Sequence, residues 1–253
     1  MNINLENAQV IARRNNKVVY RVDNYAVKLF DESFSKSDIL NEALNHARVE
    51  ETGLKVPALV EVEKIDGKWA IVTDYIEGKT LAELMKENPE KLEEYMEKFV
   101  DIQLEMHADR APMLNRLYDK LYRKISECGL DASTRYDLHT RLESLPSHNK
   151  VCQGDFNPSN IIIKDDGSYY IMDWSHAVQG NASSDAAITY LYFSLRGKDK
   201  EAKMYLDMFC KKSDTARQYV QKWMPIVAAA QLEKSTEEEK KLLMSWIDVV
   251  DYE

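Results

Sequence analysis

Residues 152–174 read CQGDFNPSNIIIKDDGSYYIMDW. Two apolar runs in this stretch are separated by Asp166-Gly167, a pair that is typical of tight β-hairpin turns. With these two as the central turn residues, Asn160 faces Asp173 across the hairpin. Directly paired residues lie about 5 Å apart and project from the same face of a sheet. The stretch therefore predicts that an amide oxygen and a carboxylate meet at the open end of the hairpin.

Asn160 and Asp173 would form a magnesium clamp, because Mg²⁺ prefers hard oxygen ligands and shares them with phosphate oxygens and water. Asp155 lies five residues before Asn160, and Pro158 keeps this interval from being the interior of a helix. A tight loop there would bring Asp155 to the same end, where it could orient or deprotonate an attacking hydroxyl. Alone, each of the three could be a turn former or a strand-end cap. Their placement by one hairpin register favours a site for phosphate chemistry.

A second cluster is predicted near the N-terminus. Lys28 lies in the apolar run AVKLF, residues 26–30, and a charge in such a strand needs a partner or an exposed face. Glu42 lies on a helix expected over residues 35–51. Taken alone, each would be a solvent-facing charge. Together with the hairpin residues, they predict an ion pair that presents the Lys28 ammonium to nucleotide phosphates.

The order of elements predicts an α+β chain with two lobes. Alternating apolar residues and turn signals predict strands and one inserted helix in the first part of the chain, at residues 18–22, 25–30, 35–51 (the helix), 58–62 and 69–73. After residue 78 the apolar spacing becomes helical. We therefore expect a β-rich lobe over residues 1–76 and a mainly helical lobe over residues 77–253.

Composition excludes several classes of protein. The chain has 253 residues, of which 44% are hydrophobic and 30% charged, as in globular proteins. A net charge of −9 argues against a nucleic-acid binder, which needs a basic face. Three cysteines without metal-ligand spacing predict a reducing compartment. There is no apolar run of roughly 20 residues to span a membrane, so we expect a cytoplasmic protein.

The motif Gln153-Gly154-Asp155, followed by Asn160 and Asp173-Trp174, resembles the aminoglycoside phosphotransferase/choline kinase family. The resemblance extends along most of the chain, through Ala26-Val-Lys28, Glu42, Val56-Pro57, the hinge-like residues 71–78, and Gly180 with Asp185. These are small-molecule kinases with a protein-kinase-like bilobal fold. The resemblance implies transfer of the γ-phosphate of ATP, with Mg²⁺, to a hydroxyl of an aminoglycoside-, choline- or thiamine-like acceptor.

The resemblance also assigns roles to residues. Asp155 would be the catalytic aspartate, and Asn160 and Asp173 would hold Mg²⁺. Lys28, positioned by Glu42, would contact the α- and β-phosphates.

Other residues would bind the adenine ring or support the catalytic loop. The Asp74 carbonyl and the Ile76 amide would bind the adenine edge, with Ala26 and Val72 as apolar lining. Asp185 would brace the catalytic loop.

Two departures from the family pattern motivate an alternative. Gln153 replaces the family's histidine, and residues 12–17, ARRNNK, lack the glycines of a phosphate-covering loop. Asn15 and Asn16 tolerate left-handed turns, and Arg13, Arg14 or Lys17 could contact phosphate. The alternative is a pseudokinase-like module that binds nucleotide or a partner without turnover.

The acceptor is expected to be a small molecule. The interval from Asp173 to Asp185 is short and no A-P-E motif follows, so we expect no docking segment for a peptide. Aromatic side chains of the C-terminal helices would either fill the core or stack on a cationic head group: Tyr190, Tyr192, Trp223 and Trp246.

Overall fold

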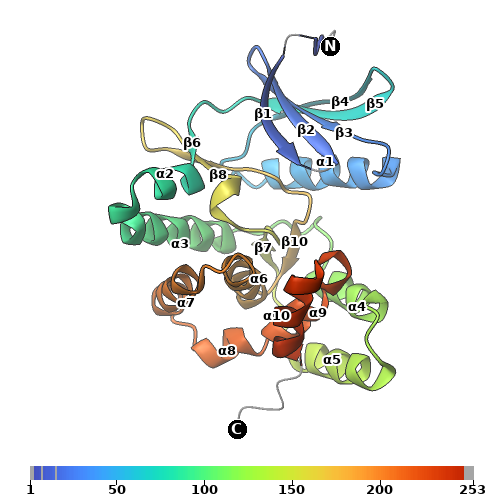
Figure 1. The fold of residues 1–253 in the computed structure, drawn as a ribbon, viewed down its shortest axis with the longest axis vertical. Coiled ribbons are helices and arrows are strands. Elements are labelled where there is room, and N and C mark those ends of the chain that lie inside the picture. The colour runs from blue at the N-terminus through green and yellow to red at the C-terminus, as the bar shows by residue number, and fades with distance from the viewer. Residues whose placement is uncertain (1–2, 7, 15, 248–253) are drawn as a thin grey trace. The chain divides into compact units, whose positions relative to one another are not determined.

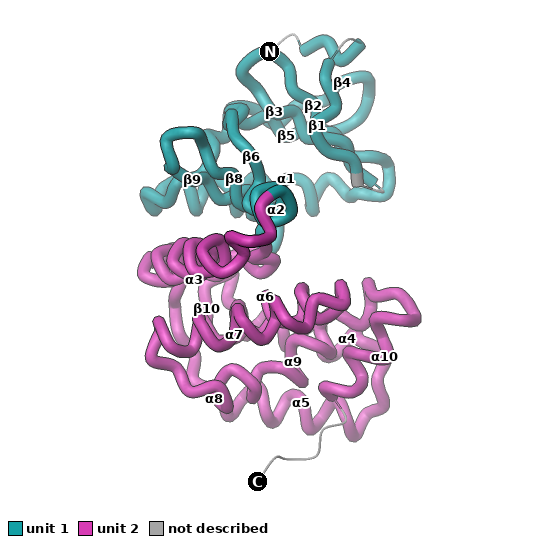
Figure 2. The backbone as a smooth tube through the Cα atoms, turned by 60° about the vertical axis from the view of Figure 1, so that its left-hand side comes forward, with its two compact units in different colours: residues 1–87, 158–176 teal, residues 88–157, 177–253 magenta. Residues whose placement is uncertain are grey.

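The structure is a computed structural model that describes residues 3–6, 8–14 and 16–247. The chain divides into two compact units (Figure 2). Unit 1 comprises residues 1–87 and 158–176, and unit 2 comprises residues 88–157 and 177–253. Unit 1 therefore includes residues 158–176, with the hairpin around Asp166-Gly167, as well as the N-terminal β-rich part, whereas the sequence predicted one boundary at residue 76.

Unit 1 is built on a five-stranded antiparallel sheet of order β1-β2-β3-β5-β4 (Figure 1). The strands are β1 (Gln9–Arg14), β2 (Lys17–Val22), β3 (Tyr25–Phe30), β4 (Leu59–Ile65) and β5 (Lys68–Asp74). Strand β1 was not predicted. The β2–β3 and β4–β5 hairpins were predicted. Asp66 and Gly67 form the expected turn between β4 and β5, with φ of 49° and 82°.

Helix α1 (Lys36–Glu50) packs on one face of this sheet. Ile39 and Ala43 of the helix form a buried cluster with Phe30 and Ile71 of the sheet. The predicted cap at Ser35 is confirmed, because its hydroxyl accepts a hydrogen bond from the Asp38 amide at 3.1 Å. The opposite face buries a separate cluster of Val27, Ile65, Ala70 and Val72.

A three-stranded sheet of order β6-β8-β9 completes unit 1, with strands β6 (Lys79–Thr80), β8 (Ile161–Ile163) and β9 (Tyr169–Ile171). Unit 1 also contains helix α2 (Leu81–Glu87) and the 3₁₀ turn η2 (Pro158–Asn160). The predicted register of the β8–β9 hairpin is wrong by one residue. Ile161 pairs with Ile171, because the turn holds three residues rather than two and only its glycine, Gly167 (φ 80°), has a positive φ.

Unit 2 is mainly helical, as predicted. Its elements are η1 (Pro89–Lys91), α3 (Leu92–Ala108), α4 (Leu117–Glu127), α5 (Ala132–Ser144), β7 (Lys150–Cys152), β10 (Val178–Gly180), α6 (Ala182–Ser194), α7 (Asp199–Ser213), α8 (Arg217–Gln221), α9 (Met224–Ala229), η3 (Leu232–Lys234) and α10 (Glu237–Ile247). Strands β7 and β10 pair antiparallel, and they lie immediately before and after residues 153–177, which include Asp155, Asn160 and Asp173. Within the described residues, no helix combines the length and apolar character needed to cross a membrane.

Candidate active site

Two lysine side chains of unit 1 lie beside the Asp173 carboxylate. The Lys28 ammonium, on β3, forms an ion pair with Glu42 of α1, which confirms the predicted pair. The same Nζ atom lies 3.2 Å from Asp173 Oδ1. Lys17, at the start of β2, places its Nζ atom 3.5 Å from the other oxygen, Oδ2. Two cations therefore flank one carboxylate.

Burial and these ion pairs set the protonation states of the cluster. Burial alone would raise the pKa of Asp173, but the ammonium groups of Lys28 and Lys17 hold it well below its usual range. Burial would lower the pKa of Lys28, and the Asp173 and Glu42 carboxylates raise it above its usual value. Asp173 is thus ionised and Lys28 is charged at neutral pH, as an oxygen ligand and a phosphate-binding cation need to be.

The backbone at Asp173 adopts a left-handed conformation, with φ of 55°. This conformation is unfavourable for a residue other than glycine and requires support from its surroundings. Ser175 supplies part of that support, because its hydroxyl donates to Asp173 Oδ1 at 2.9 Å. Asn45 of α1 donates in turn to the Ser175 carbonyl at 3.5 Å. The aspartate is held in a fixed orientation.

Asn160 lies opposite Met172 rather than Asp173, as the corrected register requires. Its carbonyl accepts the Met172 amide at 2.7 Å, and the residue is 4% exposed. The predicted direct cross-strand pair of Asn160 with Asp173 is therefore wrong. Both residues still lie in unit 1, at the end of the β8–β9 hairpin away from its turn. An amide oxygen and an ionised carboxylate are donors that suit Mg²⁺, so this pair fits the predicted metal.

The structure places the two residues of the predicted apolar lining, Ala26 and Val72, on opposite faces of the sheet. Ala26 pairs with Thr73 across β3 and β5, while Val72 pairs with Val27. Directly paired residues share a face, so Val72 projects from the face opposite Ala26 and belongs to the buried cluster there. Thr73, which the sequence analysis did not identify, is the β5 residue on the face of Ala26.

The predicted hinge follows β5 directly. The Asp74 amide donates to the Ala58 carbonyl at 2.9 Å, and the Tyr75 amide donates to Asn24 at 2.8 Å. Within the described residues, the Ile76 amide donates no hydrogen bond. A backbone donor is thus available beside β5, at the position expected to meet the adenine edge.

The glycine-free segment forms a tight hairpin between β1 and β2, with Arg14 paired to Lys17. Asn15 and the Arg14 side chain lie outside the described residues. Of the three cations expected near phosphate, Lys17 is the one that the structure places at Asp173. The Arg13 side chain is exposed on β1.

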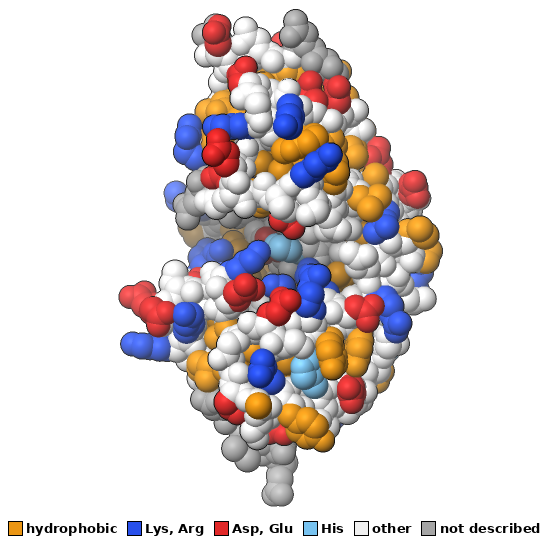
Figure 3. All heavy atoms as spheres, turned by 90° about the vertical axis from the view of Figure 1, so that its right-hand side faces the viewer, with side chains coloured by type: hydrophobic (Ala, Val, Ile, Leu, Met, Phe, Trp, Pro, Cys, Tyr) orange, Lys and Arg blue, Asp and Glu red, His pale blue; other side chains and the backbone are white. Residues whose placement is uncertain are grey.

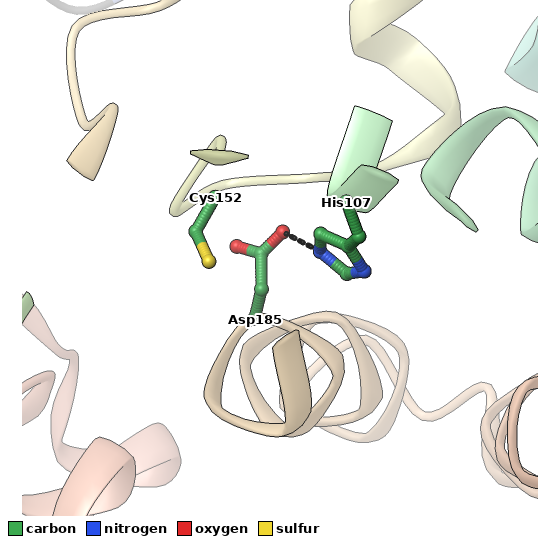
Figure 4. A group of neighbouring side chains, drawn as sticks. All are labelled: His107, Cys152 and Asp185. Atoms are coloured by element: carbon green, nitrogen blue, oxygen red, sulfur yellow. Dashed lines mark hydrogen bonds and ion pairs between the residues drawn. The ribbon is translucent and has the colours of Figure 1, made fainter. Parts of the chain in front are cut away.

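In unit 2, Asp185 of α6 braces the loop that carries Asp155, as predicted. Its Oδ1 accepts the Gly154 amide at 2.8 Å, and its Oδ2 lies 3.1 Å from His107 Nε2 of α3 (Figure 4). Asp185 and His107 are each about 1% exposed. This interaction fixes the backbone immediately before Asp155.

Gln153 also supports this loop. Its buried side chain accepts the Asp155 amide at 2.9 Å through Oε1, and Asn157 donates to the Asp155 carbonyl at 2.8 Å. Thr189 of α6 donates to the Phe156 carbonyl at 2.8 Å. Gln153, which stands where the family has histidine, therefore makes a direct hydrogen bond with the backbone of Asp155.

Cys152 lies beside Asp185 and His107, and the three could in principle ligate a metal ion. Both carboxylate oxygens of Asp185 are already used by hydrogen-bond donors. Burial raises the pKa of the Cys152 thiol well above its ordinary value, which keeps it protonated. The group is therefore better explained as a brace of the loop that carries Asp155 than as a metal centre.

Sequence reasoning did not identify His107. It lies on a regular helix, 78 residues before its partner, and no local pattern distinguishes it from a core residue.

The sheet with its paired lysine and glutamate, followed by a mainly helical unit, defines a kinase-like fold. The chain belongs to the Phosphotransferase enzyme family, whose sequence profile matches residues 8–223. Among solved structures, a choline/ethanolamine kinase family protein from Mesorhizobium loti is similar in fold, with a TM-score of 0.63 and 15% identity over 96% of this chain and 88% of that chain. No curated protein matches the sequence.

Two further structures are similar in fold. Aminoglycoside phosphotransferase APH(4)-Ia, as a thermostable mutant with ADP and hygromycin B, has a TM-score of 0.68 and 11% identity, covering 96% of this chain and 92% of that chain. Choline kinase LicA from Streptococcus pneumoniae has a TM-score of 0.63 and 18% identity, covering 94% and 92%.

Proposed function

We propose that this chain is an ATP- and Mg²⁺-dependent kinase that transfers the γ-phosphate of ATP to a hydroxyl of a small molecule. The observation that carries the proposal is the position of the Lys28 ammonium between the Glu42 and Asp173 carboxylates. A cation fixed in this way suits the phosphates of a nucleotide, and Asp173 suits a metal ion that neutralises them. Membership of the phosphotransferase family supports this proposal.

The residues of unit 1 would bind the nucleotide. Lys28 would contact the α- and β-phosphates, and Asn160 and Asp173 would hold Mg²⁺, which supplies charge neutralisation when bound. Lys17 would add a further cation. The Asp74 carbonyl and the Ile76 amide would receive the adenine edge.

Asp155 would orient the acceptor hydroxyl and accept its proton as the phosphoryl group transfers. Catalysis of this kind depends on positioning, so the backbone of Asp155 has to be held firmly. Asp185 and Gln153 do this through the Gly154 and Asp155 amides. The Gln153 hydrogen bond favours a working enzyme over a module without turnover.

The acceptor would be an aminoglycoside-, choline- or thiamine-like molecule with a free hydroxyl. Such acceptors are often cationic and can stack on aromatic rings. Tyr190 and Trp246 pack edge to face with ring centroids 5.8 Å apart, and Tyr192 lies under the Arg196 guanidinium. Tyr190 and Trp246 are partly exposed, whereas Trp223 is 3% exposed, so the first pair is the better candidate to stack on a head group.

The test is a coupled assay for ADP release with ATP, Mg²⁺ and a panel of choline, thiamine and aminoglycoside acceptors. Acceptor-dependent ADP release that disappears in D155N supports the proposal. Nucleotide binding without release for any hydroxyl compound would favour the non-catalytic alternative.

A further inference from the structure

A cavity of about 620 Å³ lies within unit 2. It is bounded by the start of α4, the segment after α5, and the ends of β7 and β10 nearest Lys150 and Gly180. Asp155 is not among its lining residues, so the cavity is separate from the proposed catalytic aspartate. Its volume falls within the range of small-molecule sites, roughly 300–1,000 Å³.

The lining is basic. Arg110, Arg116, Lys150 and His148 contribute to it, and no aspartate or glutamate does. This contrasts with a chain whose net charge is −9. Figure 3 looks onto the side of unit 2 that carries α4 and α5, where Lys and Arg side chains are interspersed with acidic ones. The acid-free lining is thus a local departure from a mixed surface.

The described residues provide no ion-pair partner for the cations of the lining. In the part of the chain that the structure describes, no carboxylate lies within 4.0 Å of the charged nitrogens of Arg110, Arg116 or Lys150. Arg110 donates to the carbonyls of Ala108 and Asp109 instead, at 3.2 and 3.1 Å. Guanidinium groups of this kind match the oxygens of a phosphate or carboxylate.

A buried donor adds an independent observation. Trp223, which lines the cavity, is 3% exposed, and its indole N–H has no hydrogen-bond partner among the described residues. A buried donor without an acceptor destabilises the structure relative to a paired one. The wall of the cavity therefore contains a donor that the described residues leave unpaired.

The walls of the cavity are firmly built. Gln179 donates to the carbonyls of Pro112 and Leu114 at 2.8 and 2.7 Å, which ties β10 to the segment before α4. A side chain at Gly180 would bring its Cβ to within 2.4 Å of Leu117, so glycine permits this close approach of β10 to α4. The site therefore needs little ordering on binding.

We propose that this cavity binds a small organic oxyanion, a molecule that carries phosphate or carboxylate groups. Lys150, which is half-buried, and Arg116 bind the anionic groups, and Arg110, Arg116 and His148 form the exposed rim. Leu117 and Tyr118 of α4 offer apolar and aromatic surface to the rest of the molecule. The inference goes beyond the proposed kinase function and does not depend on it.

The test is calorimetric titration of the full chain with pyrophosphate and, separately, with citrate, without Mg²⁺ and at constant ionic strength. We expect saturable binding of at least one probe to the wild type and to K28M, which removes a cation of the nucleotide site. The two probes distinguish a phosphate site from a carboxylate site. R116Q and K150Q should each weaken binding by tenfold or more.

R123Q is the matched control, because Arg123 is an exposed cation of the same helix, α4, but does not line the cavity. The affinity of R123Q for the probe that binds should stay within twofold of the wild-type affinity. The proposal would be overturned by the absence of saturable binding of both probes, or by equal losses of affinity in R123Q and K150Q. Binding abolished by K28M would also overturn it, since the anion would then occupy the nucleotide site. Thermal melting confirms that each variant is folded.

Discussion

Lys17 Nζ lies 3.5 Å from Asp173 Oδ2, on the carboxylate that Lys28 contacts through Oδ1. The segment between β1 and β2 has no glycine between residues 12 and 17, so it departs from the glycine-rich composition of a phosphate-covering loop. The position of Lys17 offers a different means of binding phosphate, because a side-chain ammonium reaches the site from the start of β2.

We therefore expect K17Q to raise the KM for ATP by about 5- to 30-fold, because it removes one charge-assisted hydrogen bond that contributes roughly 1–2 kcal/mol to binding. The kcat should change less. Initial rates over a range of ATP concentrations measure both constants. R13Q is the control, since Arg13 is exposed on β1, and its KM should match that of the wild type. Equal effects of the two substitutions would contradict a specific role for Lys17.

D155N should lower kcat by about 10²- to 10⁴-fold, because an amide cannot accept the hydroxyl proton. ATP affinity should remain within about threefold, since the nucleotide-binding residues are unchanged. Steady-state rates and an ATP titration provide the two readouts. D165N, in the exposed turn of the β8–β9 hairpin, should retain full activity. Substantial turnover by D155N would refute the assignment of the catalytic aspartate.

Much of unit 1 could be predicted because its signals are local. The turn at Asp66-Gly67, the cap at Ser35 and the spacing of Lys28 and Glu42 each depend on short-range chemistry. The register of the β8–β9 hairpin was not predicted correctly. Asp166 accepts hydrogen bonds from the Ser168 amide and hydroxyl at 2.9 and 2.5 Å. These hydrogen bonds accompany a turn of three residues, whereas the Asp-Gly pair alone favours a turn of two residues.

Other features depend on contacts that no local pattern reveals. Periodicity identifies α3 as an amphipathic helix, but it does not show that His107 meets Asp185, 78 residues later. The face of Val72 depended on the pairing of β3 with β5, which lie on either side of α1 in the sequence. A shift of one residue in a strand exchanges its two faces, so Thr73 rather than Val72 shares the face of Ala26.

D185A should lower the free energy of unfolding by about 2–4 kcal/mol, because it leaves the Gly154 amide and His107 without their buried acceptor. It should also lower kcat, since the loop before Asp155 loses its brace. D185N keeps an oxygen acceptor and should recover part of both losses. Urea unfolding and initial rates measure these effects. D199A, at an exposed position in the first turn of α7, should cost no more than about 1 kcal/mol. A D185A chain as stable as D199A would show that the brace is unimportant.

Burial lowers the pKa of Lys120 from 10.5 to about 8, with Lys124 adding to the effect and Asp185 opposing it. Between these values the unfolded chain binds more protons than the folded chain, so Lys120 makes the stability of the wild type rise with pH. K120M lacks this titrating ammonium group. Its stability relative to the wild type should therefore fall by about 1–3 kcal/mol from pH 8 to 10.5.

Urea unfolding at several pH values tests this prediction. The same series on K222M, which removes an exposed lysine, controls for the loss of one positive charge. A stability difference between K120M and the wild type that does not vary with pH would contradict the prediction.

The most direct test of the proposed nucleotide site is a calorimetric titration of ATP with and without Mg²⁺, on the wild type, D173A and D155N. We predict that Mg²⁺ strengthens ATP binding at least tenfold in the wild type and in D155N. D173A should abolish this enhancement, because it removes the carboxylate that Lys17 and Lys28 hold ionised. Binding that is absent in the wild type, or equally enhanced by Mg²⁺ in D173A, would contradict the account.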